Sequence, residues 1–320
     1  MAGGGGATFQ GKVIKVRVIV GRDILRLMQQ KILNHYLEYG LFTNPGLYED
    51  YLKTLPDDIR ELGLLIRRNF IHRTTLDAGN AGTNADLKYG DMTKVPWYRQ
   101  AEDDNLATSA AMLAELFRRD ARGLAMDRKV EDKVILTCRY VSILMASILK
   151  AKGVPARVRS GFASYFEGAK SAWDHWITQY WDKAGERWVT IDVDASLHKT
   201  GFDMYDMPEG KFDWSADTWL AVREAKKEAN YFNNAGGFKG LMVIAWELFY
   251  DFHSLMNSEI LYLHRPAMAY DGNFEKNTEE KLKEIDELAR LMQKPDDNFD
   301  KLVEVWNTKK EFRLLKGALL

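Results

Sequence analysis

Cys138 is the residue of this chain best suited to nucleophilic chemistry, and it is the only cysteine among 320 residues. It follows Thr137, a residue type that often caps the N-terminus of a helix. The unpaired N–H groups and the dipole of a first helical turn favour a thiolate over a thiol. Because this effect lowers the pKa of a thiol by at most about one unit, an effective nucleophile also needs a cationic partner such as an imidazolium.

Two strand-like segments, 173–181 and 187–193, supply a partner and a group to orient it. They flank a short polar loop, and with a turn centred on Lys183–Ala184 the imidazole of His175 lies directly opposite Asp192. Opposed side chains share a face, with Cβ atoms about 4.5–5.5 Å apart. Asp192 can then accept a hydrogen bond from one imidazole nitrogen and leave the other nitrogen for a thiol.

The register of this hairpin decides which acid orients His175. A one-residue shift would send the two side chains to opposite faces of the sheet. A two-residue shift keeps the face and places His175 opposite Asp194 or Thr190, so Asp194 is the alternative orienting residue. Taken singly, a cysteine on a helix is more often a buried apolar residue, and a histidine in a strand is usually structural. The hypothesis therefore depends on all three groups meeting.

The surrounding sequence indicates helices, then strands, then helices. A helix is predicted to begin near Thr137 and to end at Gly153, just before Pro155. The other predicted elements are strands at 12–20, 156–162, 173–181 and 187–193, helices at 23–39, 107–121, 218–232, 238–263 and 277–294, a helix start at 55–58, and loops at 74–94 and 203–217. This order is typical of the α+β class rather than of alternating β and α elements.

Composition excludes several classes of protein. Apolar residues make up 46% and charged residues 28%, as in an ordinary globular protein. The net charge of −1 argues against a nucleic-acid binder, and no apolar segment has the length of a membrane span. One cysteine permits neither an internal disulfide nor a multi-cysteine metal site. With no secretory signal apparent at the N-terminus, we expect a cytoplasmic protein with no nucleic-acid or membrane partner.

Several motifs carry a resemblance to a known family. They are the Cys138–Arg139 pair on the helix, GVPARVRSGF at 153–162, DHW at 174–176 and WVTID at 188–192. Together they resemble the transglutaminase-like core, a branch of the papain-like cysteine enzymes, and more narrowly a bacterial group of transglutaminase-like domain proteins. The segment 44–72 resembles the helical N-terminal part of that group, so the similarity covers about 42–295.

The resemblance implies a core in which a cysteine-bearing helix packs on an antiparallel sheet, with helical N- and C-terminal elaborations. We expect the parts to be an N-terminal extension with a strand and a helix (1–41), a helical N-terminal part (42–125), the transglutaminase-like catalytic core (126–217) and a C-terminal helical part (218–320).

The resemblance also implies a catalytic role for each of the three candidate residues. Cys138 would be the nucleophile, His175 the general acid and base, and Asp192 the orienting residue in acyl transfer through a thioester. The backbone N–H of Cys138 would be one oxyanion donor. Candidates for a second donor or for substrate contacts are Trp97, Gln100, Arg139 and Trp176. We expect no cofactor and no metal, and a small or peptide-like amide or ester substrate, with an amine as a further acceptor.

Other functions remain open at this stage. The sequence does not decide between transfer to an amine and hydrolysis by a peptidase or amidase. A non-catalytic binding or scaffold module with the same fold is an alternative of another class. Coenzyme A is not favoured, because the arginine–glycine run of arylamine acetyltransferases is missing. Arg139 could hold a substrate anion or a structural acid such as Asp194, whereas Arg157 and Arg159 fit a solvated strand face better than a carboxylate clamp.

Overall fold

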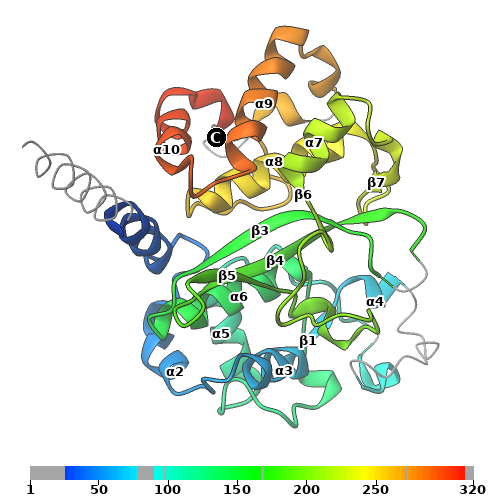
Figure 1. Ribbon diagram of the computed structural model, residues 1–320. Coiled ribbons are helices and arrows are strands. Elements are labelled where there is room, and N and C mark those ends of the chain that lie inside the picture. Colours follow the sequence, from blue (N-terminus) through cyan, green and yellow to red (C-terminus); the bar gives the residue numbers. More distant parts are fainter. Residues whose placement is uncertain (1–25, 78–89, 97, 167–168, 271, 314–320) are drawn as a thin grey trace, which may run out of the picture.

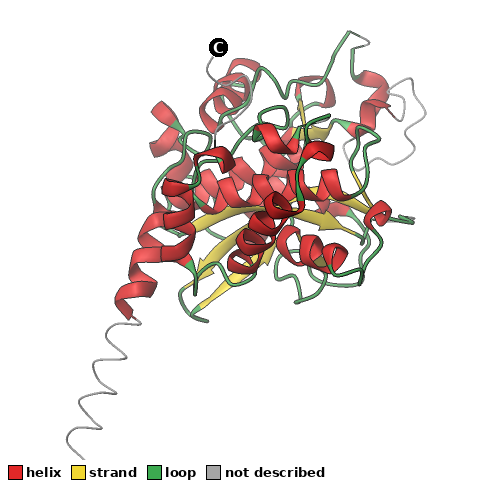
Figure 2. Cartoon of the chain, turned by 90° about the horizontal axis from the view of Figure 1, so that it is seen from above, coloured by secondary structure: helices red, strands yellow, loops and turns green. Residues whose placement is uncertain are grey.

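The computed structural model describes residues 26–77, 90–96, 98–166, 169–270 and 272–313. The strand expected at 12–20 and the candidate Trp97 lie outside these residues. The described part combines a curled, mainly antiparallel sheet with helices, which confirms the predicted α+β class. In Figure 1 the strands lie between two groups of helices, and Figure 2 shows helices lying across the strands from a direction turned by 90°.

The central sheet has the strand order β5-β4-β3-β6, and β7 pairs with β4 in parallel. Its strands are β3 (Ala156–Ala163), β4 (Ala172–Asp182), β5 (Arg187–Ile191), β6 (Phe212–Trp214) and β7 (Phe232–Asn233). The first three agree with the predicted strands to within two residues. The last two were missed, because β6 lies in the segment predicted as a loop and β7 begins at the last residue of the helix predicted over 218–232.

The close approach of β6 to β3 depends on a glycine. Gly161 of β3 pairs with Trp214 of β6. A Cβ atom at Gly161 would lie 2.5 Å from the carbonyl oxygen of Asp213, which is far inside van der Waals contact. A short strand with few pairs and a glycine neighbour leaves only a weak periodic signal in the sequence, which explains why it was not predicted.

The helix that carries the thiol, α6 (Cys138–Ala151), lies at the centre of the molecule. Each of its 14 residues is buried. It begins where the sequence predicts, and Gly153 (φ +75°) follows its end. It packs against β4 and β3 on one side and against the N-terminal helices on the other. These helices are α2 (Glu49–Lys53), α3 (Ile59–Asn69) and α5 (Ser109–Arg119), and a further helix at 26–37 precedes them in the chain.

The C-terminal helices cover the other side of the sheet (Figure 1). They are α7 (Ser215–Arg223), α8 (Leu241–Leu255), α9 (Glu279–Met292) and α10 (Phe299–Thr308). α8 packs across β3 and against α7. Thr278 caps the N-terminus of α9, and its hydroxyl accepts a hydrogen bond from the Lys281 N–H, so the cap is one residue later than the predicted Asn277.

Short elements complete the described chain. β1 (Phe70–His72) and β2 (Val134–Leu136) form a separate parallel pair, and α4 (Thr74–Asp77) follows β1. The 3-10 turns are η1 (Gly46–Tyr48), η2 (Met92–Lys94), η3 (Val130–Asp132), η4 (Asp194–Leu197), η5 (Ala229–Tyr231), η6 (Ala267–Ala269), η7 (Phe274–Lys276) and η8 (Lys310–Phe312).

Two buried arginines join the sheet to the C-terminal helices. Arg159 forms two hydrogen bonds with the buried carboxylate of Asp251 on α8, at 2.7 and 2.9 Å. Arg157 contacts Asp296 at 2.6 Å and lies over the ring of Trp188. The expectation of a solvated strand face was therefore wrong. These ion pairs hold layers together and leave neither guanidinium for a substrate.

Candidate active site

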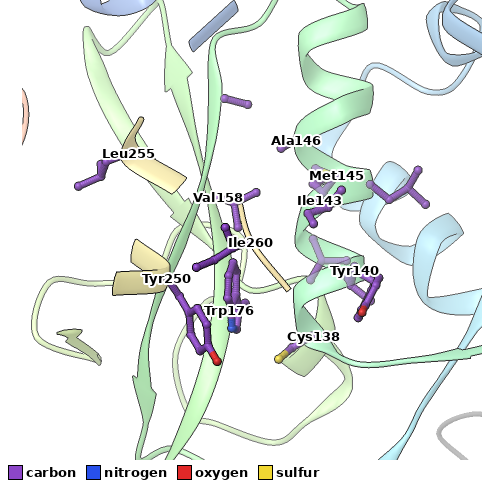
Figure 3. Packing of buried hydrophobic residues seen from close by; sticks show 14 of the residues in the cluster. Cys138, Tyr140, Ile143, Met145, Ala146, Val158, Trp176, Tyr250, Leu255 and Ile260 are labelled. Atoms are coloured by element: carbon purple, nitrogen blue, oxygen red, sulfur yellow. The ribbon is translucent and has the colours of Figure 1, made fainter. Parts of the chain in front are cut away.

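Cys138 and His175 line one cavity of about 730 Å³. Cys138 is the first residue of α6, where the helix geometry leaves its N–H without an intrahelical acceptor. His175 lies on β4, whose neighbour Trp176 points into the core on the other face, as the alternation of a strand requires. In Figure 3 the Cys138 sulfur points from the start of α6 toward the side where Trp176 and Tyr250 lie.

Asp192 is the acid that contacts His175. Its Oδ2 lies 2.8 Å from His175 Nε2, and the carboxylate has no exposed surface. Oδ2 also accepts a hydrogen bond from the Tyr165 hydroxyl at 2.5 Å, and Oδ1 accepts one from the Ala195 N–H at 2.9 Å. With Nε2 engaged, Nδ1 is the imidazole nitrogen left for the sulfur. The carboxylate is held from three directions and so fixes the ring.

The hairpin register differs from the prediction by two residues. Gln179 pairs with Thr190, and Asp182 pairs with Arg187 across the turn. The turn is centred on Ala184–Gly185, one residue later than assumed, and Glu186 adopts a left-handed conformation (φ +48°) in it. The predicted contact between His175 and Asp192 nevertheless forms. β5 ends at Ile191, so Asp192 lies beyond the strand, where the chain turns into η4 and the strand register no longer applies.

Asp194, the alternative orienting residue, has other partners. Its Oδ1 accepts a hydrogen bond from the buried Arg67 at 2.8 Å, and its Oδ2 lies 3.6 Å from His72 Nε2. Burial alone would raise the pKa of Asp194, but the charges of His72 and Arg67 lower it below its ordinary value. Asp194 is therefore an ionised carboxylate within a neighbouring network.

The thiol and the imidazole shift each other's protonation. Burial alone would raise the pKa of Cys138, but the charge of His175 and hydrogen bonds with His175 and His72 lower it below its ordinary value. Burial alone would lower the pKa of His175, but Asp192 and the Cys138 sulfur raise it well above its ordinary value. Opposite charges at close range favour both ionised forms. The arrangement therefore shifts the balance from the neutral thiol and imidazole toward a thiolate–imidazolium pair.

His72 is a second imidazole beside the sulfur, and sequence reasoning missed it. β1 runs parallel to β2 with His72 paired with Leu136, two residues before Cys138. Its Nδ1 lies 2.8 Å from Thr74 Oγ1. Burial alone would lower the pKa of His72, but Asp194 and a hydrogen bond with Cys138 raise it. The pairing of two strands distant in sequence creates this contact, so local pattern gave no signal for it.

The other candidates from the sequence lie elsewhere. Gln100 is exposed and is not part of the cavity wall. Arg139 is fully buried, donates to the Ile260 carbonyl at 2.8 Å and lies over the rings of Phe42 and Trp176. Trp176 is likewise fully buried. The expectation that these three side chains contact a substrate or an oxyanion was therefore wrong, since none of them faces the cavity.

Three further titratable side chains, Asp174, Glu247 and Arg265, line the cavity. Burial raises the pKa of Asp174 to about 6. Burial, and then the charge of Asp174, raise the pKa of Glu247 well above its ordinary range, and Glu247 accepts a hydrogen bond from Ser160. Arg265 lies over the ring of Trp246 at 3.7 Å. Among the described residues, no cluster of three or more His, Cys, Asp or Glu side chains is arranged to hold a metal ion.

Residues 128–193 match the family model of the transglutaminase-like superfamily. The chain contains a transglutaminase-like core. The matched segment includes α6, β3, β4 and β5, the elements that lead to Cys138, His175 and Asp192. Searches of curated proteins and of solved structures found no match.

Within the described residues, every helix is too short or too polar to cross a membrane.

Proposed function

We propose that this protein is a cysteine-dependent enzyme that transfers an acyl group from an amide or ester through a thioester. The observation that carries the proposal is the contact at 2.8 Å between the buried Asp192 and His175, which lines the same cavity as a thiol at the start of a helix. A thiol with a lowered pKa, a base beside it and an acid that orients the base are the requirements of nucleophilic catalysis.

In the proposed reaction the Cys138 thiolate attacks the substrate carbonyl carbon. A C–S bond forms and the carbonyl electron pair moves to oxygen. The tetrahedral intermediate then collapses, the bond to the leaving group breaks, and His175 gives its proton to the leaving amine or alcohol. An incoming amine or water loses a proton to His175 and attacks the thioester, which releases the product and restores the thiolate.

Transfer to an amine is the version that we favour. Asp174 and Glu247 line the cavity that contains the thiol, and the negative charge of ionised carboxylates attracts an ammonium group. Burial raises the pKa values of both acids, and a bound ammonium group would counter this by stabilising their ionised forms. Hydrolysis of a peptide-like substrate is the second candidate, because a cavity of this volume also admits water.

Intact-mass spectrometry with p-nitrophenyl acetate tests this function. The wild-type protein should gain one acetyl group on Cys138, and Cys138→Ala should gain none. Cadaverine should then remove the acetyl group faster than buffer alone and yield acetylated cadaverine. Removal at the same rate with and without the amine would favour hydrolysis. An unmodified wild-type protein would favour the non-catalytic alternative.

The lone thiol also suits a reducing, cytoplasmic setting, and we include this localisation in the proposal.

A further inference from the structure

Acyl transfer through a thioester develops negative charge on the substrate oxygen. Preorganised hydrogen-bond donors must stabilise that charge, and loss of one donor greatly lowers the rate of acyl transfer. The N–H of Cys138 at the start of α6 is one donor. Gln100 faces solvent rather than the cavity, so it cannot be the second. The proposed function therefore requires a second donor on the cavity wall near the sulfur.

Tyr262 occupies the required position. It lines the cavity, and its hydroxyl oxygen lies 3.7 Å from Cys138 Sγ. In a tetrahedral adduct the oxyanion lies one C–S and one C–O bond away from that sulfur. A donor close to the sulfur on the cavity side is thus within hydrogen-bonding reach of the oxyanion.

The proton of the Tyr262 hydroxyl is available for this bond. The hydroxyl lies 3.0 Å from Thr137 Oγ1, whereas Thr137 Oγ1 lies 3.4 Å from Asp103 Oδ1. A thiolate can only accept a hydrogen bond, so with Cys138 ionised the phenol donates to the sulfur, and the Thr137 hydroxyl can then donate to the phenol oxygen. Burial and the negative charge of the Cys138 thiolate raise the pKa of Tyr262 well above its ordinary value, so the phenol keeps its proton at neutral and moderately alkaline pH.

The ring of Tyr262 is held in place by its surroundings. The Tyr250 hydroxyl donates to the Tyr262 carbonyl at 2.5 Å. The rings of Trp176 and Tyr250 meet the Tyr262 ring edge to face, each with a centroid separation of 6.0 Å. A donor fixed in this way does not have to reorganise when charge develops, which is the condition for a large effect on rate.

We propose that Tyr262 is a catalytic residue of this site, donating its phenolic hydrogen bond to the substrate oxyanion together with the N–H of Cys138. This inference rests on the proposed acyl transfer. When the thiolate attacks, the phenol hydrogen bond moves from the sulfur to the carbonyl oxygen as that oxygen gains the electron pair. When the intermediate collapses, the C=O bond reforms and the phenol proton stays on Tyr262. Thr137 is a positioning residue, because it acts through the phenol.

Two reagents separate this role from a role in holding the thiolate. Acylation by p-nitrophenyl acetate passes through an oxyanion, whereas alkylation by iodoacetamide displaces iodide at a saturated carbon and forms none. Both need the Cys138 thiolate. Tyr262→Phe keeps the ring and its packing and removes the donor. Thr137→Val removes the hydroxyl that directs the phenol, and Tyr48→Phe, on the remote turn η1, is the matched control.

Tyr262→Phe should slow acylation by about 100- to 1,000-fold and change alkylation far less, because alkylation loses only the hydrogen bond from the phenol to the thiolate. Thr137→Val should have a smaller effect of the same kind, and Tyr48→Phe should behave as wild type. Unchanged acylation in Tyr262→Phe would overturn the proposal. Equal losses of acylation and alkylation would also overturn it, because the phenol would then act on the thiolate or the fold. A wild-type protein that is alkylated but never acylated would overturn the proposed function itself, and this inference with it.

Discussion

Replacing Asp192 by asparagine should abolish most of the acylation of Cys138, because it changes which imidazole nitrogen of His175 holds the proton. The Ala195 N–H donates to Asp192 Oδ1 at 2.9 Å, so the oxygen of an asparagine would stay there and its NH₂ group would face His175 Nε2. Nε2 would then accept a hydrogen bond, and the proton would move to Nδ1. Nδ1 is the nitrogen that must accept the thiol proton.

The size of the effect follows from the two parts of this change. Loss of one charge-assisted hydrogen bond removes about 1.5–3 kcal/mol, which is roughly 10- to 150-fold in rate. The unproductive tautomer adds to this, and the sum for an orienting aspartate replaced by asparagine is about 10³- to 10⁴-fold. The burst of p-nitrophenol on mixing with p-nitrophenyl acetate measures the acylation rate.

Asp194→Asn is the matched control for this experiment. It disrupts the hydrogen bond with Arg67 and the contact with His72, and it should lower stability, since a buried guanidinium loses its charged partner. It leaves the His175 tautomer unchanged, so acylation should fall far less than in Asp192→Asn. If Asp194→Asn slowed acylation as much as Asp192→Asn, or if Asp192→Asn retained the wild-type rate, the assignment of the orienting acid would be wrong.

Three further predictions concern residues around the site. His72→Gln should raise the pKa of Cys138 and slow its alkylation at neutral pH by roughly tenfold; an unchanged pH profile would show that His72 does not act on the sulfur. Because the folded pKa of Asp174 is raised to about 6, its ionisation opposes folding as pH rises from about 4 to above 6. Asp174→Asn should therefore raise the free energy of unfolding at pH 8 by about 1–2 kcal/mol and change it little at pH 4, as denaturant titrations at both pH values would show. Gly161→Ala should lower stability by about 1–3 kcal/mol, because the added Cβ meets the carbonyl oxygen of Asp213; a midpoint equal to wild type would contradict the tight β3–β6 contact.

Local sequence predicted the elements that carry the candidate site. The helix start at Cys138, its end before Gly153 and the three long strands all depend on residues close in sequence, and the structure confirms them. The hairpin register failed because the centre of a turn cannot be read from composition. Lys183 to Glu186 form a four-residue connection with a left-handed residue at its end, and its centre at Ala184–Gly185 lies one residue later than the sequence suggested.

The residues that sequence reasoning missed depend on contacts between distant segments. His72 reaches the sulfur only because β1 pairs with β2, and Tyr262 reaches it from the segment after α8. The buried partner of Arg159 is Asp251, 92 positions away. A weak signal did exist for this last pair, since an acid in the apolar sequence LMVIAWELFYDFHSL of α8 requires a partner when it is buried.

The pH dependence of Cys138 alkylation by iodoacetamide tests the central claim most directly. The account predicts a thiolate stabilised by His175, so the rate should remain near its plateau from alkaline pH down through neutral pH and fall only in acid. His175→Gln, which removes the imidazolium, should move the midpoint of the profile upward, toward that of an ordinary thiol. A wild-type rate that rises with a midpoint at an ordinary thiol pKa of about 8.5, or a thiol that does not react at any pH, would contradict the account.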